Sequence, residues 1–145
     1  MLCYCDSNKK FTNCCERFLR SLFKPSTPEE LMRSRYSAYV LGDGEYIVKS
    51  TVKENRFEDD IALIKEYSKS VEWLGLEVLY AKESIVEFKA YYRDKDGIKV
   101  QHERSSFVFE NEMWLYKEGE LFDSKIERNR LCPCKSGKKY KKCCA

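Results

Sequence analysis

The sequence has little histidine, proline or glycine, and it has no long apolar run. Its 145 residues include one histidine, three prolines and six glycines. No apolar stretch approaches the roughly 20 residues that a membrane helix needs. No apolar segment typical of a signal peptide follows the first residues. We therefore expect a chain that enters no membrane and works in the cytoplasm, where thiols stay reduced.

The remaining composition is typical of a globular protein. Hydrophobic residues make up 43% of the chain and aromatic residues 14%. This length suits one domain of ordinary size with a modest core.

Charge is divided unevenly along the chain, although the total is only +3. Residues 1–24 carry five basic and two acidic side chains, and residues 124–142 carry eight and one. Residues 25–123 carry 14 basic and 21 acidic side chains. Basic ends on an acidic body indicate either an anionic partner for the ends or docking of the ends on the body.

All eight cysteines lie near the two ends, in one repeated pattern. Residues 3–15 and 132–144 both read Cys-x-Cys-x8-Cys-Cys. Other matched positions are Ser7 with Ser136, lysines 9–10 with 138–139, and Phe11 with Tyr140. Asn8 corresponds to Gly137, and both residue types tolerate positive φ, so we expect the same tight turn in both copies.

Four thiols in so short a segment suit one tetrahedral metal ion. Zinc binds cysteine thiolates at about 2.3 Å, and four of them form a closed structural site. Neighbouring lysines favour the thiolate form. The predicted ligands are Cys3, Cys5, Cys14 and Cys15 for one ion and Cys132, Cys134, Cys143 and Cys144 for the other.

Disulfides and iron are the alternatives to zinc. Eight cysteines could form four bridges in a secreted protein. Adjacent cysteines such as Cys14 and Cys15 rarely bond each other without strain, and a reducing compartment disfavours bridges. Four thiolates suit iron as well as zinc. We therefore expect two metal ions, with zinc favoured and iron left open.

The C-terminal stretch CPCKSGKKYKKCC resembles the SEC-C motif, the metal-binding tail of the SecA preprotein translocase. One such motif at each end of a central domain resembles the bacterial YchJ family. The segment TPEELMRSRYSAYVLGD also resembles that family. In the N-terminal copy Tyr4, Asp6 and Asn8 replace the usual Pro, Gly and Gly, while all four cysteines remain.

The resemblance implies a metal-binding protein whose middle domain is a cone like that of nuclear transport factor two, and it supplies no reaction. Three parts are predicted along the chain. Residues 1–24 form a SEC-C metal knuckle with a short helix, residues 25–123 form the cone, and residues 124–145 form the second knuckle.

Helix signals come before strand signals along the middle of the chain. Apolar residues between positions 18 and 23 predict a short helix that ends before Pro25. Thr27, Pro28 and Glu30 predict the start of a helix that Gly42 closes. Two more helices are predicted, one over about 46–52 and one over about 55–70, the second with Asn55 as its cap and Glu58 three residues later.

The remaining segments alternate as strands do. Strands are predicted over 71–81, 84–92, about 98–109 and 113–117, with a hairpin turn at Asp96–Gly97. Val100, His102 and Arg104 share one face of the third strand, whereas Phe107 falls on the other, which predicts a bulge between them. The expected fold class is α+β, with helices packed on a curved antiparallel sheet as a cone or cystatin-like roll.

Three residues are candidates for lining a ligand pocket in the cone. Arg35 lies within an apolar helical stripe, which indicates either a buried ion pair or an anion site. His102, the single histidine, is predicted to face the cavity as an acid or base, or else to be a hydrogen-bonded structural residue. Trp114, with Tyr36, Tyr39 and Tyr116, lines a pocket or fills the core.

The favoured function is a non-enzymatic adaptor that binds an acidic protein partner. The predicted contact residues are Lys138, Lys139, Tyr140, Lys141 and Lys142. The SEC-C resemblance implies such a role, since that tail of the translocase contacts an acidic chaperone and the ribosome. Two alternatives stay open: a small-molecule-binding or enzymatic cone that uses His102, and nucleic-acid or ribosome binding through the basic C-terminal knuckle.

Overall fold

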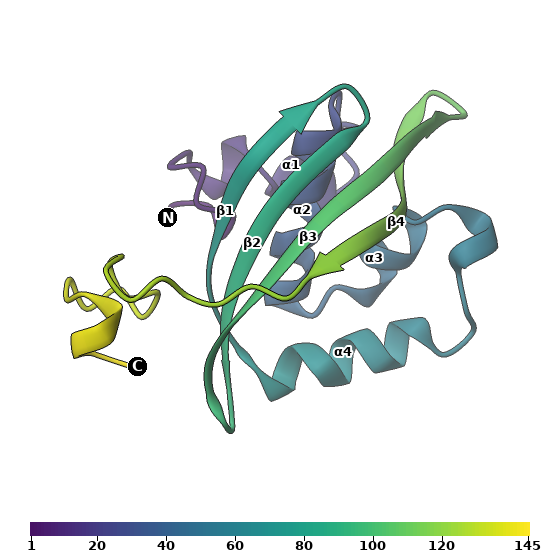
Figure 1. The fold of residues 1–145 in the computed structure, drawn as a ribbon. Helices are drawn as coiled ribbons and strands as arrows, with labels where there is room; N and C mark the ends of the chain where they lie inside the picture. The colour runs from purple at the N-terminus through teal and green to yellow at the C-terminus, as the bar shows by residue number, and fades with distance from the viewer.

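The chain places its helices before its strands, as the sequence predicts. A computed structural model describes all 145 residues. The helices are α1 (Glu16–Leu19), α2 (Pro28–Leu41), α3 (Gly44–Lys49) and α4 (Asp60–Ser70). The strands are β1 (Glu72–Lys82), β2 (Ile85–Asp94), β3 (Gly97–Glu110) and β4 (Met113–Phe122). The helices cover one face of the sheet, and the C-terminal segment crosses the other (Figure 1). The α+β fold class is confirmed.

Helix α2 begins and ends where the sequence predicts. The Thr27 hydroxyl accepts a hydrogen bond from the Glu30 amide at 3.1 Å, and Pro28 occupies the first helical position. Gly42 closes the helix with a φ of 72°. The buried face of α2 packs against β1, β2 and β4, so this helix is the main support of the sheet.

Helix α4 begins five residues later than predicted. Asn55 does not cap a helix: its side-chain amide donates to the Lys117 carbonyl at 2.6 Å. The Asp60 carboxylate instead accepts from the Phe57 amide at 2.8 Å. Residues 53–55 form a single 3-10 turn. The Asn55 side chain therefore bonds to β4, which is distant in sequence, and is not available to cap the helix.

The sheet is an antiparallel meander in the order β1-β2-β3-β4. Its curvature comes from irregular pairing: β1 has one extra residue between Trp73 and Gly75 and another between Val78 and Tyr80. The predicted bulge lies at Ser106–Phe107, but the extra residue is Lys117 on β4. Strand β3 itself alternates without interruption, and bulges of this kind bend a sheet toward a cone.

The N-terminal cysteines form part of the main core. Cys3, Cys5, Cys14 and Cys15 cluster with buried residues of α2 and the sheet, including Leu31, Met32, Tyr36 and Phe107. A smaller group joins Phe18 of α1 to Ala38, Tyr46 and Ile47. The predicted boundary between residues 24 and 25 therefore separates two segments that share one core.

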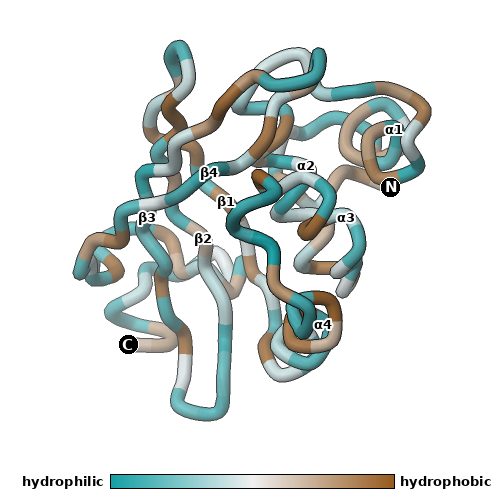
Figure 2. Tube along the Cα trace, turned by 90° about the vertical axis from the view of Figure 1, so that its right-hand side faces the viewer, coloured by the Kyte–Doolittle hydropathy of each residue, from teal (hydrophilic) through white to brown (hydrophobic).

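The β2–β3 hairpin projects from the sheet, and its tip is hydrophilic (Figure 2). Asp94 pairs with Gly97, so the two-residue turn is Lys95–Asp96, one position before the predicted one. None of the helices has both the length and the apolar character needed to cross a membrane.

The turn between β3 and β4 yields a stability prediction. Asn111 and Glu112 have φ values of 51° and 63°, a conformation in which a Cβ atom is strained. Glu112→Gly should raise the free energy of unfolding by about 0.5–1 kcal/mol, measured by urea denaturation. Glu110→Gly, in the adjacent strand, should lower it by a similar amount. A loss of stability in both variants would contradict the prediction.

Candidate metal centres

Each cysteine group brings four sulfur atoms together at the two ends of the chain. In both groups all four sulfurs lie within 4.8 Å of one another. The sulfurs of Cys14 lie 3.6 Å from Cys5 and 3.9 Å from Cys15. Those of Cys143 lie 3.5 Å from Cys134 and 3.7 Å from Cys144.

These distances suit a metal ion held by four thiolates. Sulfur atoms about 2.3 Å from a central ion at tetrahedral corners lie about 3.8 Å from each other. A disulfide requires about 2.05 Å, and all eight cysteines are free. Both groups can therefore hold metal ions, and neither is a pair of bridges.

The two knuckles share one backbone fold. The amide of Cys3 donates to the Lys9 carbonyl at 2.8 Å, and that of Cys132 donates to the Lys138 carbonyl at the same distance. Ser7 and Ser136 each lie 3.2 Å from a cysteine sulfur through the hydroxyl oxygen. Asn8 and Gly137 have φ values of 66° and 86°, as the sequence predicts for matched turns. The agreement shows a true structural repeat.

A second pair of matched positions joins the knuckles to each other. Asp6 and Lys135 both have positive φ, at 59° and 66°. The Lys135 ammonium lies 3.2 Å from the Asp6 carboxylate. The other Asp6 oxygen accepts from the Leu76 amide of β1 at 3.0 Å. One aspartate thus links the N-terminal knuckle, the edge of the sheet and the C-terminal knuckle.

Gly75 permits this contact at the bulge in β1. A Cβ atom at this position would lie 2.8 Å from the Asp6 carboxylate oxygen, which is closer than such contacts occur. The absence of a side chain therefore lets the knuckle approach the edge strand closely. A covered edge also offers fewer free amides to other chains.

The knuckles differ in their burial. All four N-terminal cysteines are buried, and Cys5 and Cys15 are 0% and 1% exposed. Arg33 donates to the Cys5 carbonyl at 2.7 Å, and Arg17 donates to the Cys14 carbonyl at 3.0 Å. In the C-terminal knuckle Cys132 is buried, whereas Cys143 and Cys144 are exposed. The first knuckle is part of the body, and the second stands on its surface.

The thiols influence one another within each group. Hydrogen bonds from Cys15 and Cys5 hold the pKa of Cys3 far below its usual value, while hydrogen bonding to Cys3 and Cys5 raises that of Cys15. Hydrogen bonds from Ser136, Cys132 and Cys143 lower the pKa of Cys134 to about 6. Hydrogen bonding to Cys132 raises the pKa of Cys144 to about 12. A cation bound by all four sulfurs of a group would favour the thiolate form of each.

Two contacts hold the C-terminal knuckle against the outer face of the sheet. Besides the Asp6–Lys135 pair, the Arg130 guanidinium lies 4.3 Å from the centre of the Tyr91 ring. Tyr91 is buried beneath it and donates to Glu77 at 3.2 Å. Burial raises the pKa of Tyr91 to about 12, so the hydroxyl remains a donor.

The predicted partner-contact residues lie on the exposed part of this knuckle. Lys138, Lys139, Lys141 and Lys142 are exposed, and Tyr140 is half-buried. These lysines are absent from the ion pairs of the protein, in contrast to Lys135.

A cavity of about 400 Å³ lies between the helices and the inner face of the sheet. Arg35 lines it, as do Tyr36, Tyr39 and Tyr116. Arg35 has no carboxylate partner, so the expected buried ion pair is absent: the guanidinium donates to Ile47, Ser50 and Thr51. The position of Arg35 in the cavity lining fits the second alternative, an anion site.

The prediction that His102 faces the cavity is wrong. The alternation of β3 turns Glu103 inward and His102 outward, the reverse of the predicted orientation. The two ring nitrogens lie 2.6 Å from the Ser124 hydroxyl and 2.8 Å from the Glu87 carboxylate. His102 therefore fastens the segment after β4 to the outer face of the sheet, a structural role.

Trp114 does not line the cavity either. Its ring packs edge-on against Phe109 at 5.3 Å, and its indole nitrogen donates to the Ser26 carbonyl at 3.2 Å. It is partly buried against the main core, which is the core-filling role that the sequence left open.

Sequence reasoning missed the polar residues of the cavity. Gln101, Glu103 and Ser105 line it together with Phe107, because all four point to the same side of β3. Counting alternate residues backward from Phe107, instead of forward from His102, would have found them.

Two family models match the chain. The model described as "YchJ, middle NTF2-like domain" matches residues 27–119, and that described as "SEC-C motif" matches residues 128–145. Among curated relatives, a UPF0225 protein of Geobacter sulfurreducens is 38% identical over 99% of this chain and 97% of its own length. One from Serratia proteamaculans is 38% identical, with 99% and 97% covered.

Solved structures show the same fold. A SEC-C motif containing protein from Psychrobacter arcticus aligns with a TM-score of 0.72 and 33% identity, covering 97% of this chain and 93% of that one. RPA3114, a SEC-C motif containing protein from Rhodopseudomonas palustris, aligns with a TM-score of 0.76 and 38% identity, covering 85% and 100%. The chain therefore belongs to the YchJ-like UPF0225 family, with a SEC-C motif following its middle domain.

Proposed function

We propose that this protein is a zinc-binding, non-enzymatic adaptor whose C-terminal knuckle binds an acidic protein partner. One observation carries the proposal: two knuckles with the same backbone fold differ in exposure. The N-terminal knuckle is built into the core, and the C-terminal one presents exposed lysines. The first therefore serves stability and the second recognition.

Zinc fits both sites because the donors are four thiols at tetrahedral spacing. Cys3, Cys5, Cys14 and Cys15 would hold one ion, and Cys132, Cys134, Cys143 and Cys144 the other. A structural ion stabilises a short loop that has no core of its own. Free thiols persist in a reducing compartment, which supports our proposal that the protein works in the cytoplasm.

The exposed side chains of Lys138, Lys139, Lys141 and Lys142 form a lysine face on the C-terminal knuckle. This face keeps its positive charge when the metal is bound. Residues 124–142 carry eight basic side chains and one acidic, so a zinc site with four thiolates leaves about +5. Asp6–Lys135 and Arg130–Tyr91 hold the knuckle in one orientation. A fixed basic surface favours an acidic partner through electrostatic complementarity.

Two observations favour an acidic protein over nucleic acid. Single-stranded nucleic acids are usually bound on several stacked aromatic rings, and this knuckle offers one half-buried ring, Tyr140. Residues 25–123 carry seven more acidic than basic side chains and would repel a long phosphate backbone.

Matched cysteine variants test the metal assignment. Freshly purified protein should contain two zinc ions per chain by elemental and native mass spectrometry. Cys14→Ser and Cys143→Ser alter the same position of the repeat, and each should remove one ion. Cys14→Ser should lower the free energy of unfolding by more than about 3 kcal/mol, because its site lies in the core. Cys143→Ser should leave it nearly unchanged.

Two results from these measurements would contradict the proposal. Iron in place of zinc contradicts the ion assignment. An equal loss of stability in both variants contradicts the division of roles between the knuckles.

Charge reversal tests the lysine face. An immobilised polyglutamate peptide is the probe, and binding is measured at low salt. Lys139→Glu combined with Lys142→Glu should weaken binding about tenfold or more. The control is Lys53→Glu combined with Lys69→Glu, which reverses the same charge on exposed positions of the body.

Removal of the C-terminal ion by Cys143→Ser should also abolish capture of the peptide. If the control pair weakens binding equally, or if Cys143→Ser has no effect, the knuckle is not the binding surface. If a single-stranded RNA oligonucleotide binds more tightly than the peptide, the partner class is wrong.

A further inference from the structure

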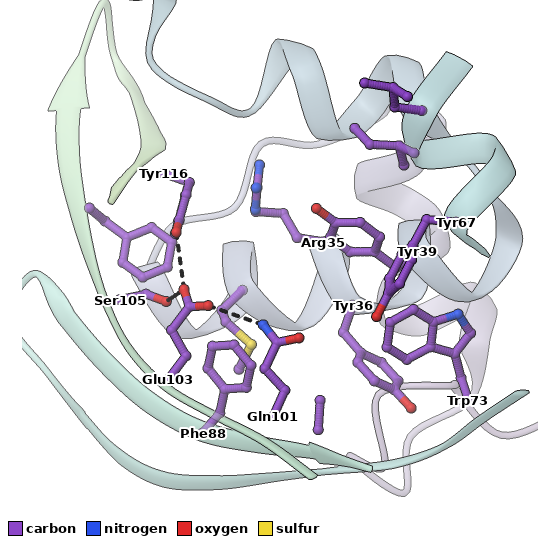
Figure 3. A pocket seen from close by; sticks show the side chains of 15 residues that line it. Arg35, Tyr36, Tyr39, Tyr67, Trp73, Phe88, Gln101, Glu103, Ser105 and Tyr116 are labelled. Carbon is purple, nitrogen blue, oxygen red and sulfur yellow. Dashed lines mark hydrogen bonds between the residues drawn. The ribbon is translucent and has the colours of Figure 1, made fainter. Parts of the chain in front are cut away.

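The cavity in the cone has a polar end and an aromatic end. Arg35, Glu103 and Tyr116 lie at one end, and Tyr39, Tyr67 and Trp73 lie at the other (Figure 3). Its volume of about 400 Å³ falls within the range of small-molecule sites. This site is separate from the cysteine knuckles and independent of the adaptor proposal.

Arg35 brings a positive charge into the cavity without a negative partner. Its three hydrogen bonds all use Nη1, to the Ile47 carbonyl at 3.0 Å, the Ser50 hydroxyl at 2.6 Å and the Thr51 hydroxyl at 3.0 Å. Nε and Nη2 are not used in these bonds. Burial lowers the pKa of Arg35, which reflects the cost of holding this charge away from water.

Glu103 does not neutralise Arg35. Its carboxylate accepts from Ser105 at 2.6 Å, from Tyr116 at 3.0 Å and from Gln101 at 3.2 Å. Arg35 instead lies over the Tyr116 ring, 4.5 Å from its centre. Tyr116 therefore contacts both groups while the carboxylate and guanidinium remain unpaired.

The aromatic end offers flat apolar surfaces. The Trp73 ring lies 5.9 Å from that of Tyr39 and 6.0 Å from that of Tyr67, between α2, α4 and β1. Aromatic rings pack well against such edges and faces. A ligand that spans the cavity would place an aromatic body here and its polar group toward Arg35.

We infer that the cavity binds a small aromatic carboxylate, with the carboxylate on the Nε and Nη2 atoms of Arg35 and the ring against Trp73. A guanidinium with two free donors matches a carboxylate bidentately, so the carboxylate of the ligand would be the directly bonded negative partner that Arg35 lacks. A cationic ligand is disfavoured because Glu103 already accepts three hydrogen bonds and Arg35 would repel it.

Calorimetry on the full chain tests this with matched probes. Benzoate, phenylacetate and 3-phenylpropionate are each compared with their neutral amides, which have the same shape without the charge. At least one acid should bind, and its amide should bind about tenfold or more weakly. If no acid binds at millimolar concentration, or if the amides bind equally well, the inference is wrong.

Three variants locate the site. Arg35→Met should weaken the acid about tenfold or more, and Arg35→Lys should weaken it less, because the charge remains. Glu103→Gln should strengthen binding, since it removes a negative charge from the cavity. Unchanged affinity in Arg35→Met would overturn the inference. Should that variant fail to fold, the comparison of acid with amide in the unaltered protein still decides.

Fluorescence checks which end holds the ring. Trp114→Phe leaves Trp73 as the single tryptophan of the chain. The acid should change the Trp73 emission of this variant, and the change should saturate at one acid bound per chain. Binding without any change in Trp73 emission would place the ligand elsewhere and contradict the inference.

Discussion

The grouping of four sulfur atoms within bonding distance of one ion is the constraint on which both ends of this protein depend. Each knuckle has thirteen residues from its first cysteine to its last, too few to bury a core of their own. The hydrogen bonds within each loop close its turns, but they drive apart the pKa values of Cys3 and Cys15 in one group and of Cys134 and Cys144 in the other. A cation bound by all four sulfurs would favour the thiolate form of each and would couple metal binding to folding of the loop.

The same loop acquires different properties from its surroundings. Around Cys5 and Cys15, arginine side chains from α1 and α2 satisfy the loop carbonyls, and apolar residues surround the sulfurs. Around Cys143 and Cys144 there is solvent and a row of lysines. The same loop is thus a core element at one end of the chain and a surface element at the other.

Local signals predicted the elements whose determinants lie within a few residues of one another. Thr27, Pro28 and Gly42 specify α2, and the cysteine spacing specifies the knuckles. Asn55 and His102 were misjudged because Lys117, Ser124 and Glu87, which bind them, are distant in sequence. The orientation of β3 depends on which of its faces turns toward the cavity, so alternation alone gives two equivalent answers.

The contact between Asp6 and Lys135 joins the buried knuckle to the exposed one. At both positions the backbone adopts positive φ, which glycine adopts without strain. This chain accepts the strain of a side chain at each and gains an ion pair between the two knuckles. The pair is exposed, so its electrostatic energy is small. Its value lies in position: it ties the surface knuckle to the buried one at the edge of β1. The position of the C-terminal knuckle therefore depends on the N-terminal knuckle, which supplies Asp6 at the edge of β1.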